Sequence, residues 1–256
     1  MAHQAFSRLR GKCMAGTNKR EREEGDVMVA PTGVPSLDER VRWSFVVVDI
    51  CDYGRQGLVC ALKETIYIKG KKAVFACPAL DIALSLRRPA RNSKVTECLV
   101  VRLPPAAREA LVMLLQLSEL VQGAAIGGLR VVVLSPFGKM LTQRLMEVMG
   151  MDELATVDAR LPTSLLCREI ALAMKREPQV QEGWQALSVL SPSERKALFL
   201  SLQNRDIYQQ ARSRSISPKT VYSQRRGALR RLGVPSVLSL LRLLNAKRYR
   251  AVQPGE

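Results

Sequence analysis

Histidine is nearly absent from this chain of 256 residues: the single one, His3, lies close to the N-terminus. A zinc site or a catalytic relay built on histidine therefore has almost no residues to use. No stretch of about 18 apolar residues occurs, so no transmembrane helix is expected. The N-terminus has no apolar segment behind its charges, which argues against a secretory signal. These absences favour a cytoplasmic protein.

The short motifs of nucleotide-dependent and hydrolytic enzymes are also missing. The sequence contains no G-x-x-x-x-G-K-[ST], G-x-G-x-x-G, H-E-x-x-H or G-x-S-x-G pattern. Its six cysteines form no C-x-x-C pair and are scattered through apolar segments, which is typical of free, mostly buried thiols in a reducing compartment. We therefore expect neither an enzyme nor a bound cofactor or metal.

Acidic residues are scarce at the C-terminal end, although basic residues are not. The whole chain has 40 Lys and Arg against 23 Asp and Glu, but the segment from Trp184 to Glu256 has 14 against 3. Positive charge concentrated in this way indicates a polyanionic partner such as nucleic acid. The alternative, a membrane surface, would require a broad apolar face with aromatic anchors beside the charges, and the basic helix of this segment lacks one.

Three short helices with clear start signals are predicted in this segment, over residues 190–244. Ser191 is followed by a proline and then by Glu194, which is the pattern of a capping box. Asp206 can cap a second helix, and Ser217, again followed by a proline, can cap a third. A third helix that begins so clearly and is this basic suits the major groove of DNA. Its basic residues are Lys219, Arg225, Arg226, Arg230 and Arg231.

The preceding part of the chain alternates between strand and helix patterns. Short apolar segments rich in β-branched residues, typical of buried parallel strands, occur at 44–50, 73–77, 96–101, 129–134 and 154–157. Helical patterns follow each of them at 52–64, 79–86, 106–121, 138–149 and 164–174. This alternation predicts an α/β domain with a doubly wound, five-stranded parallel sheet.

Four segments are therefore expected along the chain. Residues 1–42, which mix glycine, proline and charged residues, are predicted to be a disordered tail. The α/β domain occupies 43–176, and a polar linker occupies 177–189. An all-α helix-turn-helix domain follows at 190–250.

A resemblance to a known family rests on this layout and on one motif. The segment V-V-V-D-I-C-D-Y-G-R-Q-G-L, Val46 to Leu58, resembles the first strand and the start of the first helix of a response-regulator receiver. Together with the C-terminal helices, it makes residues 43–250 similar to the NarL/FixJ family, in which a receiver precedes a LuxR-type (GerE-like) helix-turn-helix. The form D-x-C-x-Y-x-R-x-G-L is more similar still to the auxiliary regulators of the Rcs capsule system, which keep the receiver shape without its phosphorylation chemistry.

The resemblance also locates the positions that receivers use for phosphorylation. Asp49 and Ile50 stand in place of an acidic pair that holds magnesium. Arg102 stands where the phosphorylated aspartate is expected, and Asp158 or a neighbour stands in place of a lysine. Only Ser135 matches the family's small hydroxyl residue. This implies a pseudo-receiver that does not take a phosphoryl group, with Asp49 serving as a cap or as a buried, hydrogen-bonded carboxylate.

Helical spacing divides the third C-terminal helix into two faces. Val221, Ala228 and Leu232 share one side and are expected to be buried. The resemblance implies that base edges are read by Tyr222, Ser223 and Arg226, and an arginine there suits guanine. Phosphate contacts, which position a protein without reading sequence, are expected from Lys219, Thr220, Arg225 and Arg230.

Some positions depart from the family pattern. Gln210 and Arg214 occupy places that are usually apolar, in and just after the second helix. Ile207 and Ala211 are expected to supply its buried side instead. Asn204 replaces the usual turn glycine, and asparagine tolerates the left-handed conformation.

Two helices are more apolar than a single small core requires. The segment Ser236–Leu244 is either a core helix or a dimer contact, and residues 106–121 either cover the sheet or also meet a partner. The resemblance implies a sequence-specific, DNA-binding transcriptional regulator, acting as a homodimer or as a heterodimer with a response regulator. The alternative is an adaptor that mainly binds another regulator and contacts DNA weakly.

Overall fold

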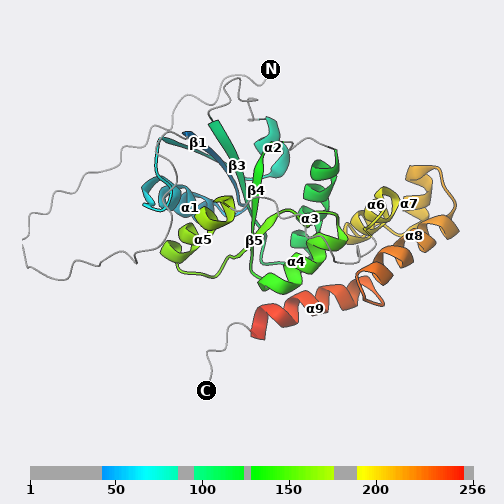
Figure 1. Ribbon diagram of the computed structural model, residues 1–256. Helices are drawn as coiled ribbons and strands as arrows, with labels where there is room; N and C mark the ends of the chain where they lie inside the picture. The colour runs from blue at the N-terminus through cyan, green and yellow to red at the C-terminus, as the bar shows by residue number, and fades with distance from the viewer. Residues whose placement is uncertain (1–41, 86–94, 124–127, 176–188, 251–256) are drawn as a thin grey trace, which may run out of the picture. The chain divides into compact units, whose positions relative to one another are not determined.

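The computed structural model describes residues 42–85, 95–123, 128–175 and 189–250 (Figure 1). The predicted tail (1–42) and linker (177–189) lie outside these residues, apart from the last position of each. Within the described ranges, no helix combines the length and the apolar character that a membrane span requires.

Parallel strands form one sheet in the first part of the chain, in the order β2-β1-β3-β4-β5 (Figure 1). This confirms the predicted doubly wound, five-stranded sheet, with a strand order typical of flavodoxin-like folds. The strands are β1 (Arg42–Val48), β2 (Lys72–Cys77), β3 (Val95–Arg102), β4 (Arg130–Ser135) and β5 (Ala155–Asp158). The helices between and after them are α1 (Asp52–Glu64), α2 (Leu80–Ser85), α3 (Ala107–Gln122), α4 (Lys139–Val148) and α5 (Thr163–Lys175).

The first strand is the one whose predicted bounds differ most. It was expected at 44–50 but runs from Arg42 to Val48. The strand ends because Asp49 turns its carboxylate back to accept a hydrogen bond from the Cys51 amide at 2.8 Å, just before α1 begins. Asp49 and Ile50 therefore lie beyond the carboxyl end of β1, at the edge of the sheet where parallel α/β folds place functional residues.

Each face of the sheet is covered by helices, and this explains why the strands read as continuous apolar segments. Helices α1 and α5 cover one face, where Leu58, Leu62 and Ile170 are buried against Phe45 and Val100. Helices α2, α3 and α4 cover the other face. Their buried residues include Leu80, Leu111, Leu114 and Met146, packed with Val48 and Val101 of the sheet. The resulting core occupies both sides of the sheet.

The C-terminal part is entirely helical, and all three predicted caps are present. Its helices are α6 (Pro192–Leu202), α7 (Ile207–Arg214), α8 (Pro218–Arg231) and α9 (Val237–Arg250). Ser191 forms the expected capping box with Glu194, and Ser217 accepts a hydrogen bond from the Thr220 amide. Asp206 caps α7 in a second capping box with Gln209, which the sequence reading had not identified.

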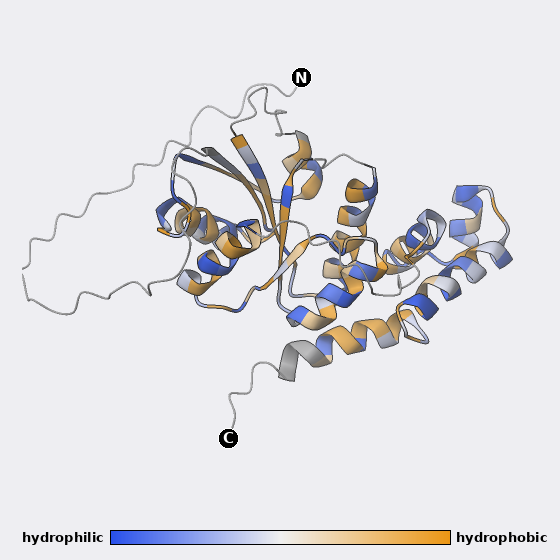
Figure 2. Cartoon of the chain, in the orientation of Figure 1, coloured by the Kyte–Doolittle hydropathy of each residue, from blue (hydrophilic) through white to orange (hydrophobic). Residues whose placement is uncertain are grey.

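Helix α8 packs against both α6 and α7. The predicted stripe of Val221, Ala228 and Leu232 is buried, and Leu229 joins it. Asn204 has a φ of 61°, which confirms the left-handed turn expected between α6 and α7. The helix α9 that follows is coloured largely hydrophobic in Figure 2, with Leu240 and Leu244 buried and Leu238 exposed.

Helix α7 shows how a polar residue fills an apolar position. Ala211 is buried as expected and Ile207 is half-buried, but Gln210 is fully buried as well. Its side-chain nitrogen donates to the Ser201 hydroxyl at 3.1 Å and to the Arg205 carbonyl at 2.9 Å. These hydrogen bonds offset the cost of burying the amide nitrogen and tie α7 to the end of α6, whereas the buried side-chain oxygen has no hydrogen-bond partner among the described residues.

Candidate nucleic-acid interface

Helix α8 presents a continuous polar and basic face to solvent. The side chains of Lys219, Tyr222, Ser223, Arg226 and Arg230 are all exposed, opposite the buried stripe that holds the helix on α6 and α7. All five are among the residues for which the resemblance implies base or phosphate contacts. No carboxylate among the described residues pairs with any of the three cations. The face is therefore positively charged and sterically open to a ligand.

The N-terminus of α8 is held by side chains of its own first turn. Besides accepting from the Thr220 amide at 3.0 Å, the Ser217 hydroxyl lies 2.8 Å from the Thr220 hydroxyl. Both residues are exposed. A serine cap of this kind stabilises a helix by about 1 kcal/mol, so the residues that follow it begin from a defined backbone position.

Two of the predicted contact residues also interact with each other. The Arg225 guanidinium lies 6.0 Å from the centre of the Tyr222 ring, within the range of a cation–π interaction. Tyr222 remains 49% exposed, while Arg225 is half-buried. The contact directs Arg225 along the helix toward Tyr222 and limits the freedom of both side chains.

A buried carboxylate fixes α8 against α6. Glu194 accepts from the Ser191 amide at 2.8 Å and from Nε of Arg231 on α8 at 3.2 Å. Burial by itself would raise the pKa of Glu194, but the hydrogen bonds from Ser191 and the nearby Arg231 outweigh it and hold the pKa below its ordinary value. The carboxylate is therefore charged at neutral pH. Gly227 makes this approach possible, because a Cβ there would lie 2.4 Å from Oε1 of Glu194.

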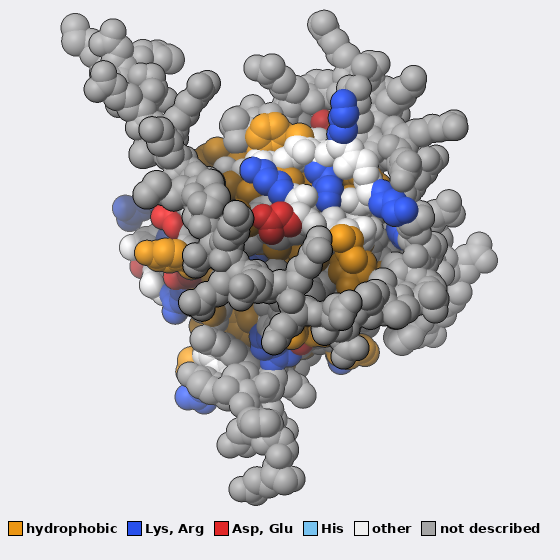
Figure 3. Space-filling model, turned by 90° about the vertical axis from the view of Figure 1, so that its left-hand side faces the viewer, with side chains coloured by type: hydrophobic (Ala, Val, Ile, Leu, Met, Phe, Trp, Pro, Cys, Tyr) orange, Lys and Arg blue, Asp and Glu red, His pale blue; other side chains and the backbone are white. Residues whose placement is uncertain are grey.

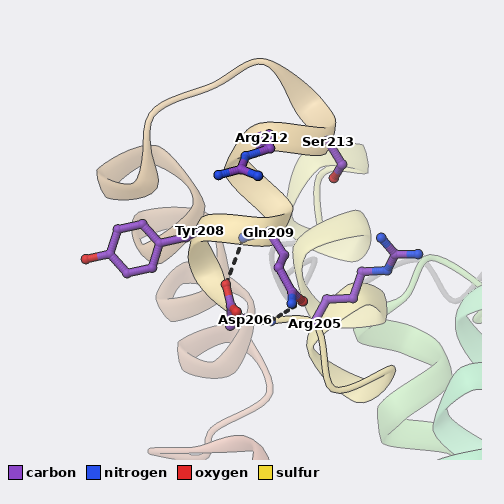
Figure 4. A pocket seen from close by; sticks show the side chains of 6 residues that line it. All are labelled: Arg205, Asp206, Tyr208, Gln209, Arg212 and Ser213. Atoms are coloured by element: carbon purple, nitrogen blue, oxygen red, sulfur yellow. Dashed lines mark hydrogen bonds between the residues drawn. The ribbon is translucent and has the colours of Figure 1, made fainter.

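The structure adds exposed residues on α7 and in the turn before it, which the sequence had not assigned to a site. Arg205, Tyr208 and Arg212 are exposed, and they line a shallow hollow together with Asp206, Gln209 and Ser213 (Figure 4). A signal was present in the sequence, because Tyr208 and Arg212 have the four-residue spacing of neighbours on a helix.

Positive charge is less concentrated on another face of the molecule than on α8. On the face shown in Figure 3, Lys and Arg side chains lie scattered among hydrophobic and acidic ones. In the hydropathy colouring of Figure 2, most of α7 is hydrophilic. No group of three or more metal-ligating side chains is found among the residues that the structure describes. Of the cysteines in these ranges, Cys77, Cys98 and Cys167 are buried, whereas Cys51 and Cys60 are exposed, and all are free thiols.

The residues that the resemblance places at a receiver's phosphorylation positions meet at the carboxyl edge of the sheet. Asp49 is 4% exposed, and its Oδ2 lies 3.6 Å from Nη1 of Arg102. Arg102 also donates to the Ala159 carbonyl at 3.3 Å. Asp49 is thus the buried carboxylate that the sequence allowed: its Oδ1 accepts from the Cys51 amide, whereas its Oδ2 has the ion pair with Arg102 but no hydrogen-bond partner among the described residues. Gly54 leaves room for this carboxylate, because a Cβ at this position of α1 would lie 2.6 Å from Oδ2 of Asp49.

The other polar residues of this edge have partners close by. Asp158 and Arg160 form an ion pair at 2.5 Å, and the hydrogen bond from Arg160 lowers the pKa of Asp158. Ser135 is buried, with its hydroxyl 2.6 Å from that of Thr142 on α4. The remaining arginine of the motif, Arg55, donates to the Asp49 carbonyl and pairs with Asp52. Three aspartates and three arginines therefore balance one another along the edge.

Comparisons with known proteins were made by sequence and by structure. The sequence matches no protein-family model and none of the curated proteins. Among solved structures, RcsB from Salmonella enterica serovar Typhimurium bound to a promoter is similar with a TM-score of 0.47 and 17% identity, covering 79% of this chain and 98% of RcsB. Full-length FixJ from B. japonicum is similar with a TM-score of 0.33 and 18% identity, covering 82% of this chain and 98% of FixJ. The response regulator StyR is similar with a TM-score of 0.34 and 20% identity, covering 80% of this chain and 98% of StyR.

Proposed function

We propose that this protein is a sequence-specific, DNA-binding transcriptional regulator that inserts α8 into the major groove. The observation that carries the proposal is the face of α8: a capped helix, fixed on its buried side by α6 and α7, with exposed cations and polar side chains on the other. A helix of this kind matches the width of the major groove. The helix-turn-helix domain (190–250) would bind DNA, and the α/β domain (43–176) would control when and with which partner.

The exposed residues of α8 divide into two roles. Tyr222 and Ser223 lie in the N-terminal half, where recognition helices reach base edges, and Arg226 lies about one turn further along the same exposed face. Arg226 has the donors for a bidentate contact to guanine O6 and N7. The other predicted residues surround them and are assigned to phosphates, which hold the helix in place without reading sequence. They are Lys219, Thr220, Arg225 and Arg230.

Discrimination between DNA sequences should depend on Arg226 alone among these arginines. We expect Arg226→Ala to lose about 1–3 kcal/mol of preference for a selected genomic site over an unrelated fragment. Arg230→Ala, the matched control on the same helix, should weaken binding to both fragments equally and reduce the salt dependence by about one phosphate contact. Gel shifts across a salt series measure both quantities. Equal losses on both fragments for Arg226→Ala would contradict the base-reading role.

The α/β domain is proposed to act as a pseudo-receiver, independent of phosphorylation. Arg102 has no nucleophilic carboxylate to accept a phosphoryl group. Asp49 is already paired with that arginine, and Ile50 removes the second ligand that magnesium would need. Because the charges of the edge balance one another, the edge has no net attraction for an anion or for a divalent cation.

Treatment with acetyl phosphate should therefore leave the protein unmodified. We expect intact-mass spectrometry to show no added phosphoryl group in the presence of magnesium, and the DNA affinity to stay unchanged. Asp49→Asn serves as the control, because it removes the acidic residue that matches a magnesium ligand of the family's receivers. A phosphoryl adduct in the wild type that disappears in this variant would overturn the pseudo-receiver proposal.

The protein is proposed to work as a homodimer or as a heterodimer with a response regulator. Exposed Leu238 and Leu243 on α9 give that helix an apolar surface beyond the buried Leu240 and Leu244, which favours a role in pairing. The adaptor alternative differs in one measurable respect. Tight, fragment-specific binding by the pure protein supports the regulator, whereas binding only in the presence of a second regulator supports the adaptor.

A further inference from the structure

Strand β2 forms one edge of the sheet and has β1 as its only neighbour in the strand order. The Trp43 amide donates to the Lys71 carbonyl at 3.0 Å, and the parallel register then turns the backbone groups of the odd-numbered residues of β2 toward β1. Because successive residues of a strand direct these groups to opposite edges, those of Lys72, Val74 and Ala76 face outward. A row of outward amides and carbonyls is a template for pairing with another strand.

The exposed side chains of β2 are apolar. Phe75 is 53% exposed, and Ala73 and Ala76 are exposed as well. Edge strands are commonly protected by a lysine, a proline or a covering segment. The lysine of this strand, Lys72, instead donates to the Thr65 carbonyl of its own chain at 2.6 Å. None of the residues of β5, at the opposite edge, is exposed. Of the two edges, β2 is therefore the one without protection.

From these features we infer that two copies of this chain pair through β2, antiparallel and centred on Val74, so that their sheets become one. This register exchanges hydrogen bonds between all the outward groups, with Lys72 opposite the partner's Ala76. Residues directly opposite share a face, so the ring of Phe75 lies over the partner's Ala73, and a large side chain meets a small one. The inference rests on the proposed function, because it assigns the homodimer a surface in the α/β domain.

The charges at the two ends of β2 favour a second copy as the occupant. Lys69 and Lys71 are exposed just before the strand, whereas Asp81 is exposed just after it, on α2. None of the three has an ion-pair partner among the described residues. In the antiparallel arrangement, the lysines of one copy approach the partner's Asp81 at both ends of the pair. Opposite charges therefore meet, whereas a parallel arrangement would bring like charges together.

The test is sedimentation velocity of the full chain over a concentration series, without DNA, which measures self-association. Phe75→Lys should weaken it by about tenfold or more, because each dimer loses two buried rings. Met140→Lys is the matched control on α4, where Met140 is 81% exposed, and it should leave self-association unchanged. Ala76→Pro should also weaken it, because proline removes an outward amide. Since β1 does not use that amide, the urea midpoint of this variant should stay close to that of the wild type.

A charge exchange tests the antiparallel register. Asp81→Lys alone should weaken self-association several-fold at low salt, because it places like charges together at both ends of the pair. Lys71→Glu alone should act in the same direction. The double variant Lys71→Glu, Asp81→Lys restores opposite charges between the copies and should recover most of the lost affinity. A double variant that associates no better than either single variant would contradict the register.

Failure of the inference and failure of the proposed function give different results. A wild type that remains monomeric throughout the concentration series overturns the inference. A dimer that Phe75→Lys leaves intact overturns it as well and assigns the pairing to another surface, such as α9. Neither result depends on DNA binding. The proposed function fails separately, if the wild type binds no duplex in gel shifts.

Discussion

Gly227→Ala is expected to destabilise the helix-turn-helix domain by about 1–2 kcal/mol, although alanine in the middle of a helix is normally the more stable residue. Replacing a glycine by alanine inside a helix usually stabilises the protein by about 1 kcal/mol. Here the added methyl group would lie 2.4 Å from Oε1 of Glu194. The carboxylate cannot move without giving up the capping box, worth about 1 kcal/mol, and the charged hydrogen bond from Arg231, worth about 1.5–3 kcal/mol.

A matched control for this variant lies in the α/β domain. Gly57 occupies the middle of α1, and a Cβ there would meet nothing within 4 Å. Gly57→Ala should therefore stabilise its domain by about 0.5–1 kcal/mol. Hydrogen exchange followed by mass spectrometry reports each domain separately through peptides of α8 and α1. Slower exchange of α8 in Gly227→Ala would show that Glu194 relaxes at little cost.

Arg102→Leu is expected to destabilise the α/β domain by about 2 kcal/mol. The change leaves the Asp49 carboxylate, only 5% exposed, without its cation, and removing one partner of a buried ion pair costs about 3–5 kcal/mol. We expect less than this range because the arginine is about a third exposed. Buried Trp43 in β1 provides a fluorescence signal for urea unfolding of this domain.

Two controls separate the ion pair from other effects of the substitution. Arg160→Leu breaks the more exposed pair with Asp158 and should cost about 1 kcal/mol or less. The double variant Asp49→Asn, Arg102→Leu removes both charges and should recover part of the stability lost in Arg102→Leu. A single variant as stable as the wild type would show that Asp49 is accommodated without Arg102.

Much of the fold could be predicted because its signals are local. The predicted bounds of α1 agree with the structure at both ends, since Asp52 begins the helix and Glu64 ends it. The start of three helices could be predicted from their caps, Ser191, Asp206 and Ser217, because capping depends only on the residues of the adjoining turn. The parallel sheet followed from apolar segments that only a sheet covered on both faces can accommodate.

What escaped prediction depends on residues far apart in the sequence. Nothing around Gly227 indicates that its missing side chain makes room for Glu194, 33 residues earlier. The pairing of Asp49 with Arg102 requires β1 and β3 to be neighbours, which follows only from the strand order. The α7 surface was missed for a different reason: its exposure depends on which side of α7 packs on α8, and the buried Gln210 hides that side from a hydrophobicity pattern.

The balanced charges at the carboxyl edge of the sheet also constrain which substitutions the edge can accept. Aspartate at position 102 would place a second carboxylate beside that of Asp49 and would remove the cation that now lies 3.6 Å from it. An acid at position 50 would add a fourth aspartate to an edge whose three arginines already have partners. Because like charges at close range repel one another, each of these changes alone is expected to cost stability, and a compensating cation would have to accompany it.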